Sequence, residues 1–248
     1  MTVKTLVTSG VNRAVRPLGV QVVRGWSDDP AIQPFLSARR TLANAKRAGL
    51  SLCEYIDQYS AEPGTTAATV QAMLKLADLG DHVERVCEIG PGTGRFAEPV
   101  MAALHPDVYE AYETAADWRA HLRGVPGITL LPADGHSLKP TATGSVDLIH
   151  AHRVFVYLPL VVTIGYLKEM ARVTRPGGVT AFDIVTEDCL DAEATDRWVT
   201  ENAIIYNMIP RQWVIELMDR HGLSLVGNSF APLSGAKSEY FVFRKRVD

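Results

Sequence analysis

The sequence is poor in cysteine and has no long apolar run. Its three cysteines, Cys53, Cys87 and Cys189, are spread over 248 residues, and this spacing fits neither a disulfide framework nor a zinc site. The longest apolar run, residues 154–167, is too short to cross a bilayer and contains Pro159. We therefore expect reduced thiols and no membrane span.

The first residues do not predict a secretory signal peptide. Residues 1–19 hold no unbroken apolar stretch, because Arg13, Arg16 and Pro17 interrupt them. Together with the scarcity of cysteine, this predicts a cytoplasmic protein.

Positive charge is not in excess. The chain has 25 lysines and arginines against 28 acidic residues, a net charge of −3, and an isoelectric point near 6.2. No overall positive field exists to attract a phosphate backbone, so the charge argues against a nucleic-acid partner and favours a small substrate. The composition, 47% hydrophobic and 21% charged, is typical of a globular protein with one α/β domain and an extra lobe.

From residue 83 onward, short apolar runs alternate with amphipathic helical stretches. This alternation is typical of βαβ units around a parallel sheet. One helix should end before Pro176, and another should follow Pro210 and end at Gly222. The expected strands span residues 85–89, 108–113, 128–133, 146–151 and 179–185, and the runs 223–227 and 239–243 could complete the sheet.

Upstream of residue 83 the pattern indicates helices without strands, around residues 34–59 and 66–79. We expect an N-terminal arm and helical cap over residues 1–80, and a main domain over residues 81–248. The fold class predicted for the main domain is α/β, with a doubly wound, seven-stranded, mostly parallel sheet whose last strand is antiparallel.

The strongest local signal is the run Glu-Ile-Gly-Pro-Gly-Thr-Gly at residues 88–94, which follows a strand and precedes a helix. Gly90, Gly92 and Gly94 allow the backbone to turn sharply and to approach a ligand where a Cβ would collide. A dinucleotide fingerprint would need another glycine at position 95, where Arg95 stands, and a P-loop would need Gly-Lys-Ser/Thr. Both nucleotide interpretations are therefore weakened.

This turn resembles the first motif of the class I S-adenosylmethionine-dependent methyltransferases, which has an acid two places before a GxGxG turn. Glu88 and the three glycines match that motif in full, and the resemblance extends over residues 83–185. It implies a Rossmann-like fold, S-adenosyl-L-methionine as cofactor, S-adenosyl-L-homocysteine as product, and methyl transfer as the activity.

Acids recur at successive strand ends, where the cofactor's ammonium, ribose hydroxyls and adenine amine need acceptors. The resemblance implies that Glu113 bridges the ribose hydroxyls, that Asp134 meets the adenine amine, and that Glu88 acts on the methionine end through the glycine turn. We interpret Trp118 and Tyr112 as packing aromatics. The expected cofactor-binding residues are Glu88, Gly90, Pro91, Gly92, Gly94, Glu113, Thr114, Asp134, Gly135, His136, Ala151 and Tyr59.

The catalytic position implied by the resemblance is the end of the fourth strand, where His152 stands. An imidazole with a near-neutral pKa is a suitable general base. His150, two residues earlier, should point to the same side and is the competing candidate. Nitrogen methyltransferases of the superfamily often carry Asp/Asn-Pro-Pro-aromatic here, whereas this chain has Ala-His-Arg-Val at 151–154, which favours oxygen methylation.

The function expected from the sequence is therefore O-methylation of a small-molecule or sugar hydroxyl. Three alternatives stay open: an N-methyltransferase of a small amine, a catalytically silent methyltransferase-like subunit, and an NAD-dependent oxidoreductase. The expected partner is a small-molecule or carbohydrate acceptor whose identity the sequence leaves open. A homo-oligomer also stays open.

Three further segments invite specific interpretations. Asp183, Glu187 and Asp188 could bind a divalent cation, but their spacing fixes no geometry, so solvated carboxylates are favoured and no metal is predicted. Residues 190–208 lie where this fold inserts substrate lids. Residues 12–20 resemble a segment of methyltransferases associated with sugar and polysaccharide modification.

Overall fold

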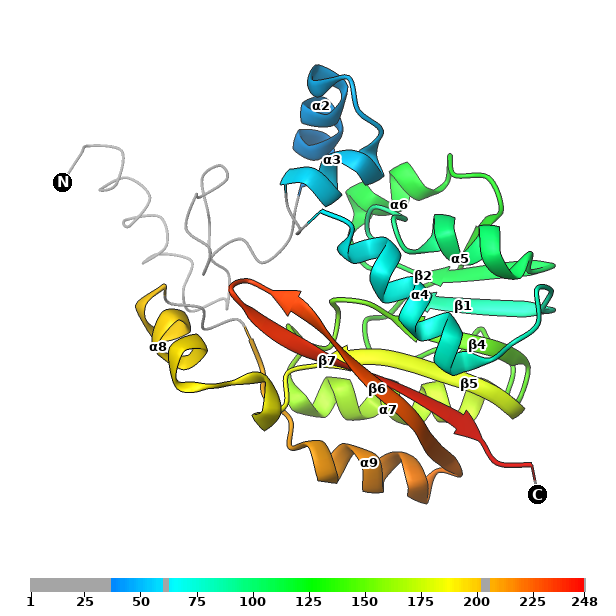
Figure 1. Ribbon diagram of the computed structural model, residues 1–248. Coiled ribbons are helices and arrows are strands. Elements are labelled where there is room, and N and C mark those ends of the chain that lie inside the picture. The colour runs from blue at the N-terminus through cyan, green and yellow to red at the C-terminus, as the bar shows by residue number, and fades with distance from the viewer. Residues whose placement is uncertain (1–36, 60–62, 202–205, 248) are drawn as a thin grey trace, which may run out of the picture.

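The sheet lies at the centre of the computed structural model, which describes residues 37–59, 63–201 and 206–247 (Figure 1). Its seven strands are arranged in the order β3-β2-β1-β4-β5-β7-β6. Strands β1 to β5 are parallel, whereas β7 is antiparallel to both β5 and β6. The predicted seven-stranded, doubly wound fold is confirmed. The strands are β1 (Arg85–Ile89), β2 (Val108–Tyr112), β3 (Ile128–Leu130), β4 (Val146–Ala151), β5 (Thr174–Ile184), β6 (Leu223–Leu233) and β7 (Ala236–Lys245).

Helices cover both faces of the sheet (Figure 1). Because side chains alternate along a strand, Val86 and Leu148 pack with helices α4 (Thr65–Ala77) and α5 (Ala97–Leu104). Cys87 and Ile149 point the other way, into a core shared with α7 (Leu160–Val173) and α9 (Arg211–Arg220). The central strands are therefore buried on both sides, as a parallel sheet requires. The other helices are α2 (Ala38–Ala48), α3 (Leu52–Tyr59), α6 (Ala116–Leu122), the 3₁₀ turn η2 (Glu187–Cys189) and α8 (Ala192–Thr200).

The helices upstream of residue 83 pack against different parts of the main domain. Helix α4 packs against β6 and β7, where Leu76 lies over Gly227 and the Arg244 guanidinium hydrogen-bonds the Ala77 carbonyl. The first turn of helix α2 instead contacts α6, where the Ala38 N–H donates to Asp117 Oδ2 at 2.9 Å. Helix α4 thus belongs to the layer that covers the sheet, and the division into a cap over residues 1–80 and a main domain stays a prediction.

Several strand boundaries differ from expectation. Strands β6 and β7 are both longer than the predicted runs 223–227 and 239–243, and β2 ends one residue earlier than predicted. Strand β3 ends at Leu130 instead of residue 133, because Pro132 has no N–H to continue the ladder. Strand β5 begins earlier, at Thr174, and the Pro-Gly-Gly run at 176–178 forms a bulge between the pairs Val146–Thr174 and Leu148–Val179.

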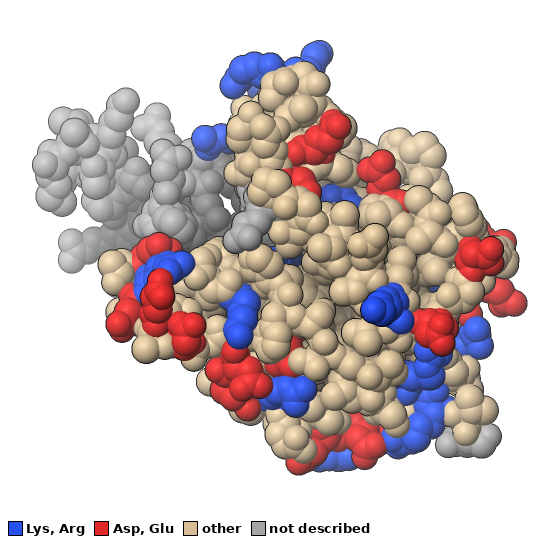
Figure 2. All heavy atoms as spheres, in the orientation of Figure 1, with Lys and Arg blue, Asp and Glu red and all other residues tan. Residues whose placement is uncertain are grey.

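The surface has no single dominant sign of charge on the face shown in Figure 2, where acidic and basic side chains are interspersed around a largely uncharged centre. None of the described helices is long and apolar enough to cross a membrane. The segment at residues 12–20 lies outside the described residues, so its resemblance stays a prediction.

Candidate functional site

A cavity of about 710 Å³ opens at the carboxyl ends of β1, β2 and β4, beneath α3. This size falls within the range of small-molecule sites, roughly 300–1,000 Å³. It also lies where ligands bind in open α/β sheets, beside the point at which the strand order reverses. The cavity wall includes Gly90, Gly92, Glu113, Trp118, Gly135, His152, Arg153 and Ser234.

The glycine turn forms one wall of the cavity. The Gly90 N–H donates to the Tyr112 carbonyl at 2.8 Å, and a Cβ at Gly90 would lie 2.6 Å from Val154 Cγ2. A Cβ at Gly92, by contrast, would meet no protein atom within 4 Å. Gly90 is thus required for packing within the protein, whereas Gly92 leaves room for a ligand to lie against the backbone.

Glu113 holds this turn to the end of β2. Its carboxylate accepts the N–H of Gly92 at 2.9 Å and the N–H of Ala115 at 2.8 Å. Glu113 and the neighbouring Thr114 both line the cavity. A carboxylate fixed in this way has acceptor capacity left for hydroxyl groups of a ligand.

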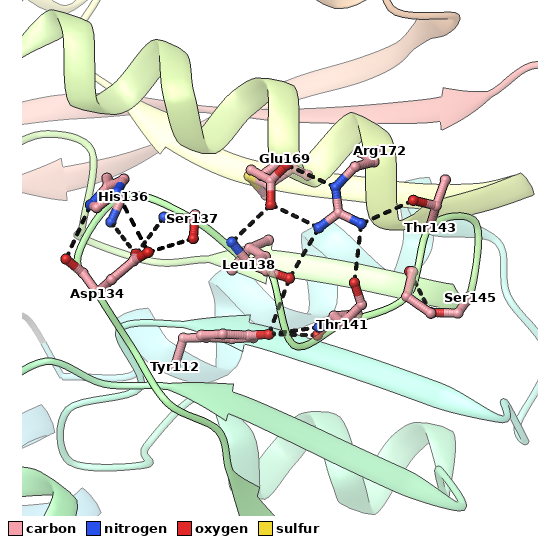
Figure 3. Close-up of polar contacts among 12 residues, drawn as sticks. Tyr112, Asp134, His136, Ser137, Leu138, Thr141, Thr143, Ser145, Glu169 and Arg172 are labelled. Atoms are coloured by element: carbon pink, nitrogen blue, oxygen red, sulfur yellow. Dashed lines mark hydrogen bonds and ion pairs between the residues drawn. The ribbon is translucent and has the colours of Figure 1, made fainter.

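The loop after β3 is shaped by Asp134 (Figure 3). Its Oδ1 accepts the N–H groups of His136 and Ser137, at 3.0 and 2.7 Å, and its Oδ2 accepts the Ser137 hydroxyl at 2.5 Å. Although burial acts in the other direction, these bonds lower the pKa of Asp134 to about 2. Gly135 lines the cavity, while Asp134 and His136 are not among the lining residues.

Arg172 of α7 fastens the same loop to the sheet layer (Figure 3). Its guanidinium makes two bonds to Glu169, at 2.8 and 2.7 Å, and donates to the carbonyls of Leu138 and Thr141. Glu169 in turn accepts the Leu138 N–H at 2.9 Å. This clamp fixes the loop that carries Gly135 to the cavity wall.

Glu88 lies below the cavity in a buried polar group. Strand register places it beside His150, with 4.0 Å between Glu88 Oε1 and His150 Nδ1. The Tyr109 hydroxyl donates to Glu88 Oε2 at 2.7 Å and lies 2.9 Å from His150 Nε2. Burial raises the pKa of Glu88 to about 8 and lowers that of His150 to about 3. At neutral pH both side chains are thus mainly uncharged.

The raised pKa of Glu88 predicts a pH dependence of stability. Below pH 4.5, the ordinary pKa of a glutamate, the carboxyl is protonated in both the folded and the unfolded state, and its contribution is fully present. Between 4.5 and about 8 the unfolded chain ionises first, so stability should fall by up to about 1.4 kcal/mol per pH unit. We expect Glu88→Gln, which cannot ionise and can still accept from Tyr109, to remove this slope.

Urea unfolding of both proteins between pH 5 and pH 8 measures this effect. The variant should gain stability over the native protein as the pH rises, and curves that stay parallel would contradict the prediction. Glu216→Gln, on the exposed side of α9, is the matched control.

His152 follows β4 and lines the cavity. Its ring stacks on Phe96 with 4.0 Å between ring centres, and its two ring nitrogens are buried without a hydrogen-bond partner. Burial, and then the charges of His150, Arg95 and Arg153, hold its pKa well below the ordinary value of 6.5. His152 is thus a neutral imidazole with free capacity for a hydrogen bond.

His150 lies on the same side as His152, as predicted, with 4.9 Å between ring centres. It is fully buried and is not among the residues that line the cavity. The geometry therefore favours His152 over His150 for contact with a ligand.

The three acids at and after the end of β5 have different surroundings in the structure. Asp183 is fully buried and accepts the Arg153 N–H at 2.7 Å, so its interpretation as a solvated carboxylate is wrong. Glu187 accepts the Arg211 N–H at 2.8 Å, and Asp188 lies 3.8 Å from the Arg211 side chain. No group of three metal-ligating side chains occurs in the described parts of the chain.

The described part of the expected lid, residues 190–201 and 206–208, packs on the turn between β6 and β7. Trp198 Nε1 donates to the Ser234 carbonyl at 3.0 Å, and the Tyr206 hydroxyl donates to Ser234 Oγ at 2.5 Å. Tyr206 also packs against Tyr157, at 5.5 Å between ring centres. Since Ser234 and Tyr157 line the cavity, this segment supports the wall; its role in specificity stays a prediction.

The structure brings most of the predicted site residues to one cavity. The lining includes Tyr59, Gly90, Pro91, Gly92, Glu113, Thr114, Gly135 and His152. The remaining predicted residues are not among the lining residues: Glu88, Gly94, Asp134, His136, Ala151 and His150. The lining also includes residues that were not predicted to be part of the site, among them Arg95, Trp118, Arg153 and Tyr157.

Residues 87–182 match the family model described as a methyltransferase domain. Residues 87–182 therefore form a methyltransferase domain. The segment begins in β1, ends in β5, and includes the glycine turn, Glu113 and His152. The match to a methyltransferase domain decides against the NAD-dependent oxidoreductase, which the glycine turn alone had left open. No curated protein matches the sequence.

Solved methyltransferase structures share the fold. The N-methyltransferase NodS of Bradyrhizobium japonicum, in complex with S-adenosylhomocysteine, has 18% identity and a TM-score of 0.58, over 84% of this chain and 96% of that one. The complex of the Haloferax volcanii Trm112 methyltransferase activator with a proposed methyltransferase has 15% identity and a TM-score of 0.59. The match covers 91% of this chain and 100% of that one. Phosphoethanolamine N-methyltransferase 2 of Haemonchus contortus, in complex with S-adenosylmethionine, has 12% identity and a TM-score of 0.56. The match covers 73% of this chain and 53% of that one.

The cavity of this methyltransferase domain fits its cofactor, S-adenosylmethionine. A long ligand can lie against Gly92, where no protein atom occupies the Cβ position. Glu113 offers a fixed carboxylate beside that space, and Trp118 offers an aromatic wall.

Proposed function

We propose that this enzyme transfers the methyl group of S-adenosylmethionine to a hydroxyl of a small molecule or sugar, with His152 as the general base. The observation that carries the proposal is the state of His152 at the cavity wall. Both of its ring nitrogens are buried and unpaired, and a buried polar group without a partner costs about 1–3 kcal/mol. A hydroxyl of the acceptor would supply the missing partner.

The cofactor end of the proposed site comprises the turn at Gly90–Gly92, Glu113 and Gly135. Glu113 would accept from the ribose hydroxyls while it holds the Gly92 N–H. Trp118 and Tyr112 both line the cavity, so they would pack along the adenosine. Asp134 would act on this end indirectly, because its carboxylate is used to shape the loop that carries Gly135.

When bound, the cofactor supplies an electrophilic methyl group on a sulfonium. The task left to the protein is to hold the acceptor oxygen in line with that carbon, about 3–3.5 Å away, and to remove the hydroxyl proton. His152 is neutral, so one ring nitrogen is free to accept this proton. Phe96, stacked on the ring, fixes the plane of the imidazole.

Methylation of a small amine is the second candidate, and the N-methyltransferase NodS, which shares the fold, favours it. A neutral amine brings its own lone pair and needs no base before the transfer. The two functions therefore differ in their need for His152. The silent subunit is a third candidate and would show cofactor binding without turnover.

A screen for release of S-adenosylhomocysteine tests the proposal. Sugars, phenols and small amines are offered with S-adenosylmethionine, and a reaction without acceptor corrects for self-methylation. We expect turnover with hydroxyl compounds. Turnover with amines alone would replace the proposal by N-methylation, and cofactor binding without turnover on any of the three classes would favour the silent subunit.

A further inference from the structure

Two arginines line the cavity close enough to His152 for their charges to lower its pKa. Arg95 follows the glycine turn directly, Arg153 follows His152, and both line the cavity. Among the described residues of the lining, Glu113 is the one carboxylate, and it is bound to the turn beside β2. The end of the cavity next to His152 is thus rich in donors and poor in acceptors.

Arg95 has donor capacity that the protein does not use. Its Nη1 is buried without a hydrogen-bond partner, and the nearest carboxylate oxygen, Asp57 Oδ1, lies 3.9 Å away. Asp57 already accepts the Gly64 N–H at 2.9 Å and the Thr66 hydroxyl at 2.5 Å. Burial, and then the charge of Arg153, lower the pKa of Arg95.

Arg153 is held rigidly at the cavity wall. Its backbone has φ +59°, a left-handed conformation that few side chains adopt. Its N–H donates to Asp183 Oδ1 at 2.7 Å, its Nε lies 3.9 Å from Asp183 Oδ2, and its Nη2 hydrogen-bonds the Pro232 carbonyl. The backbone and Nη2 contacts hold Arg153 in place, whereas the ion pair between its side chain and Asp183 is long, like that of Arg95 with Asp57.

We propose that the acceptor carries an oxyanion, a carboxylate or phosphate, that binds to Arg95 and Arg153 while its hydroxyl faces His152. Guanidinium groups suit such an anion because they offer parallel N–H donors at the spacing of its oxygens. This inference rests on the proposed function and narrows it to acidic hydroxyl compounds. Uronic acids, sugar phosphates and hydroxybenzoates are members of this class.

The position of the two arginines also links binding to chemistry. Their charges help to lower the pKa of His152, and an anion placed between them would offset that part of the shift. His152 would then accept a proton more readily when an acidic acceptor is in place. Neutral hydroxyl compounds would lack both the anchor and this effect.

The methionyl carboxylate of the cofactor has the same chemistry and is the competing occupant. The experiment separates the two sources by first saturating the protein with S-adenosylhomocysteine, which brings its own carboxylate. Inorganic phosphate and acetate are then titrated into this complex and followed by calorimetry. We expect both anions to bind the native complex, and Arg95→Gln to weaken this binding about 10- to 100-fold.

Affinity for S-adenosylhomocysteine should change less than about threefold in Arg95→Gln, and Arg95→Lys should recover part of the anion binding. Arg220→Gln, which removes an exposed charge at the end of α9, is the matched control and should behave like the native protein. A comparable loss of S-adenosylhomocysteine affinity in Arg95→Gln would assign Arg95 to the cofactor and overturn the proposal.

Matched acceptors give the second arm of the test: glucuronic acid against glucuronamide, and 4-hydroxybenzoate against 4-hydroxybenzamide. The acid of a methylated pair should have the higher kcat/KM, by at least about tenfold, and this preference should disappear in Arg95→Gln. Turnover of neutral members without anion binding would refute the acidic acceptor and leave hydroxyl methylation standing. Anion binding with turnover of amines alone would support the anion site and refute hydroxyl methylation.

Discussion

Gly92→Val is expected to abolish detectable binding of S-adenosylhomocysteine. The native position has φ +52°, lines the cavity, and has no protein atom within 4 Å of where a Cβ would stand. The valine side chain would therefore fill space that we assign to the cofactor. An overpacked contact costs about 1–3 kcal/mol, and displacement of the turn from Glu113 adds to it, so we expect affinity to fall about 100-fold or more.

Backbone strain must be separated from this direct effect, because valine is also unfavourable at positive φ. Gly144 provides the matched control: it has φ +63°, also has no protein atom within 4 Å of a Cβ, and is not part of the cavity lining. Gly144→Val should lower the melting temperature by a similar amount and leave calorimetric binding intact. Native affinity in Gly92→Val would show that the cofactor does not lie against this turn.

The ligand-facing turn at Gly90–Gly94 could be predicted from the sequence because its signal is local. Three glycines in alternation after a strand indicate a turn that a ligand approaches, whatever the rest of the chain does. Glu113 could be placed in the same way, since it ends a strand that the apolar pattern marks out. The structure brings both to one cavity, and the hydrogen bond from the Gly92 N–H to Glu113 joins them.

The role of Asp134 was harder to predict from the sequence. The run Asp-Gly-His-Ser allows the aspartate side chain to bond the backbone two and three residues later, and the structure has those bonds. The sequence contains this turn signal, but it does not say whether the carboxylate faces the turn or the ligand. In the structure the carboxylate bonds within the turn, in a loop whose Leu138 backbone is held by Glu169 and Arg172 of α7, a helix distant from the loop in the chain.

Side-chain contacts between neighbouring strands could not be predicted from the sequence. Glu88 meets His150 because β1 and β4 are adjacent in a particular register, and no local pattern encodes a parallel register. The same reason explains why Arg95 and Arg153 were missed, since each arginine taken alone looks like a solvated surface residue. Their presence in one cavity requires the ends of β1 and β4 to be neighbours.

His152→Ala is expected to lower kcat about 10² to 10⁴-fold on a hydroxyl acceptor while affinity for S-adenosylhomocysteine stays nearly unchanged. General base catalysis acts on the chemical step, and its removal typically costs a factor of this size. His152 lies at the end of β4, whereas the cofactor contacts that we assign lie at the ends of β1 and β2 and in the loop after β3. Because the ring packs on Phe96, thermal unfolding is measured alongside, and His152→Gln, with a side chain of similar size, separates loss of the base from loss of packing.

The pH profile distinguishes a base from a structural histidine. In the native enzyme, burial and the neighbouring charges hold the pKa of His152 well below 6.5, so the acidic limb of kcat/KM, which reports the free enzyme, should lie below that value. In His152→Ala the defect should shrink at high pH, because the acceptor hydroxyl ionises there without help. A histidine needed only for packing would give lost stability and no such recovery. If His150→Ala loses activity and His152→Ala does not, the base is His150, acting through a rearranged cavity wall; if both variants keep full activity, positioning alone drives the transfer and the acceptor is already a good nucleophile.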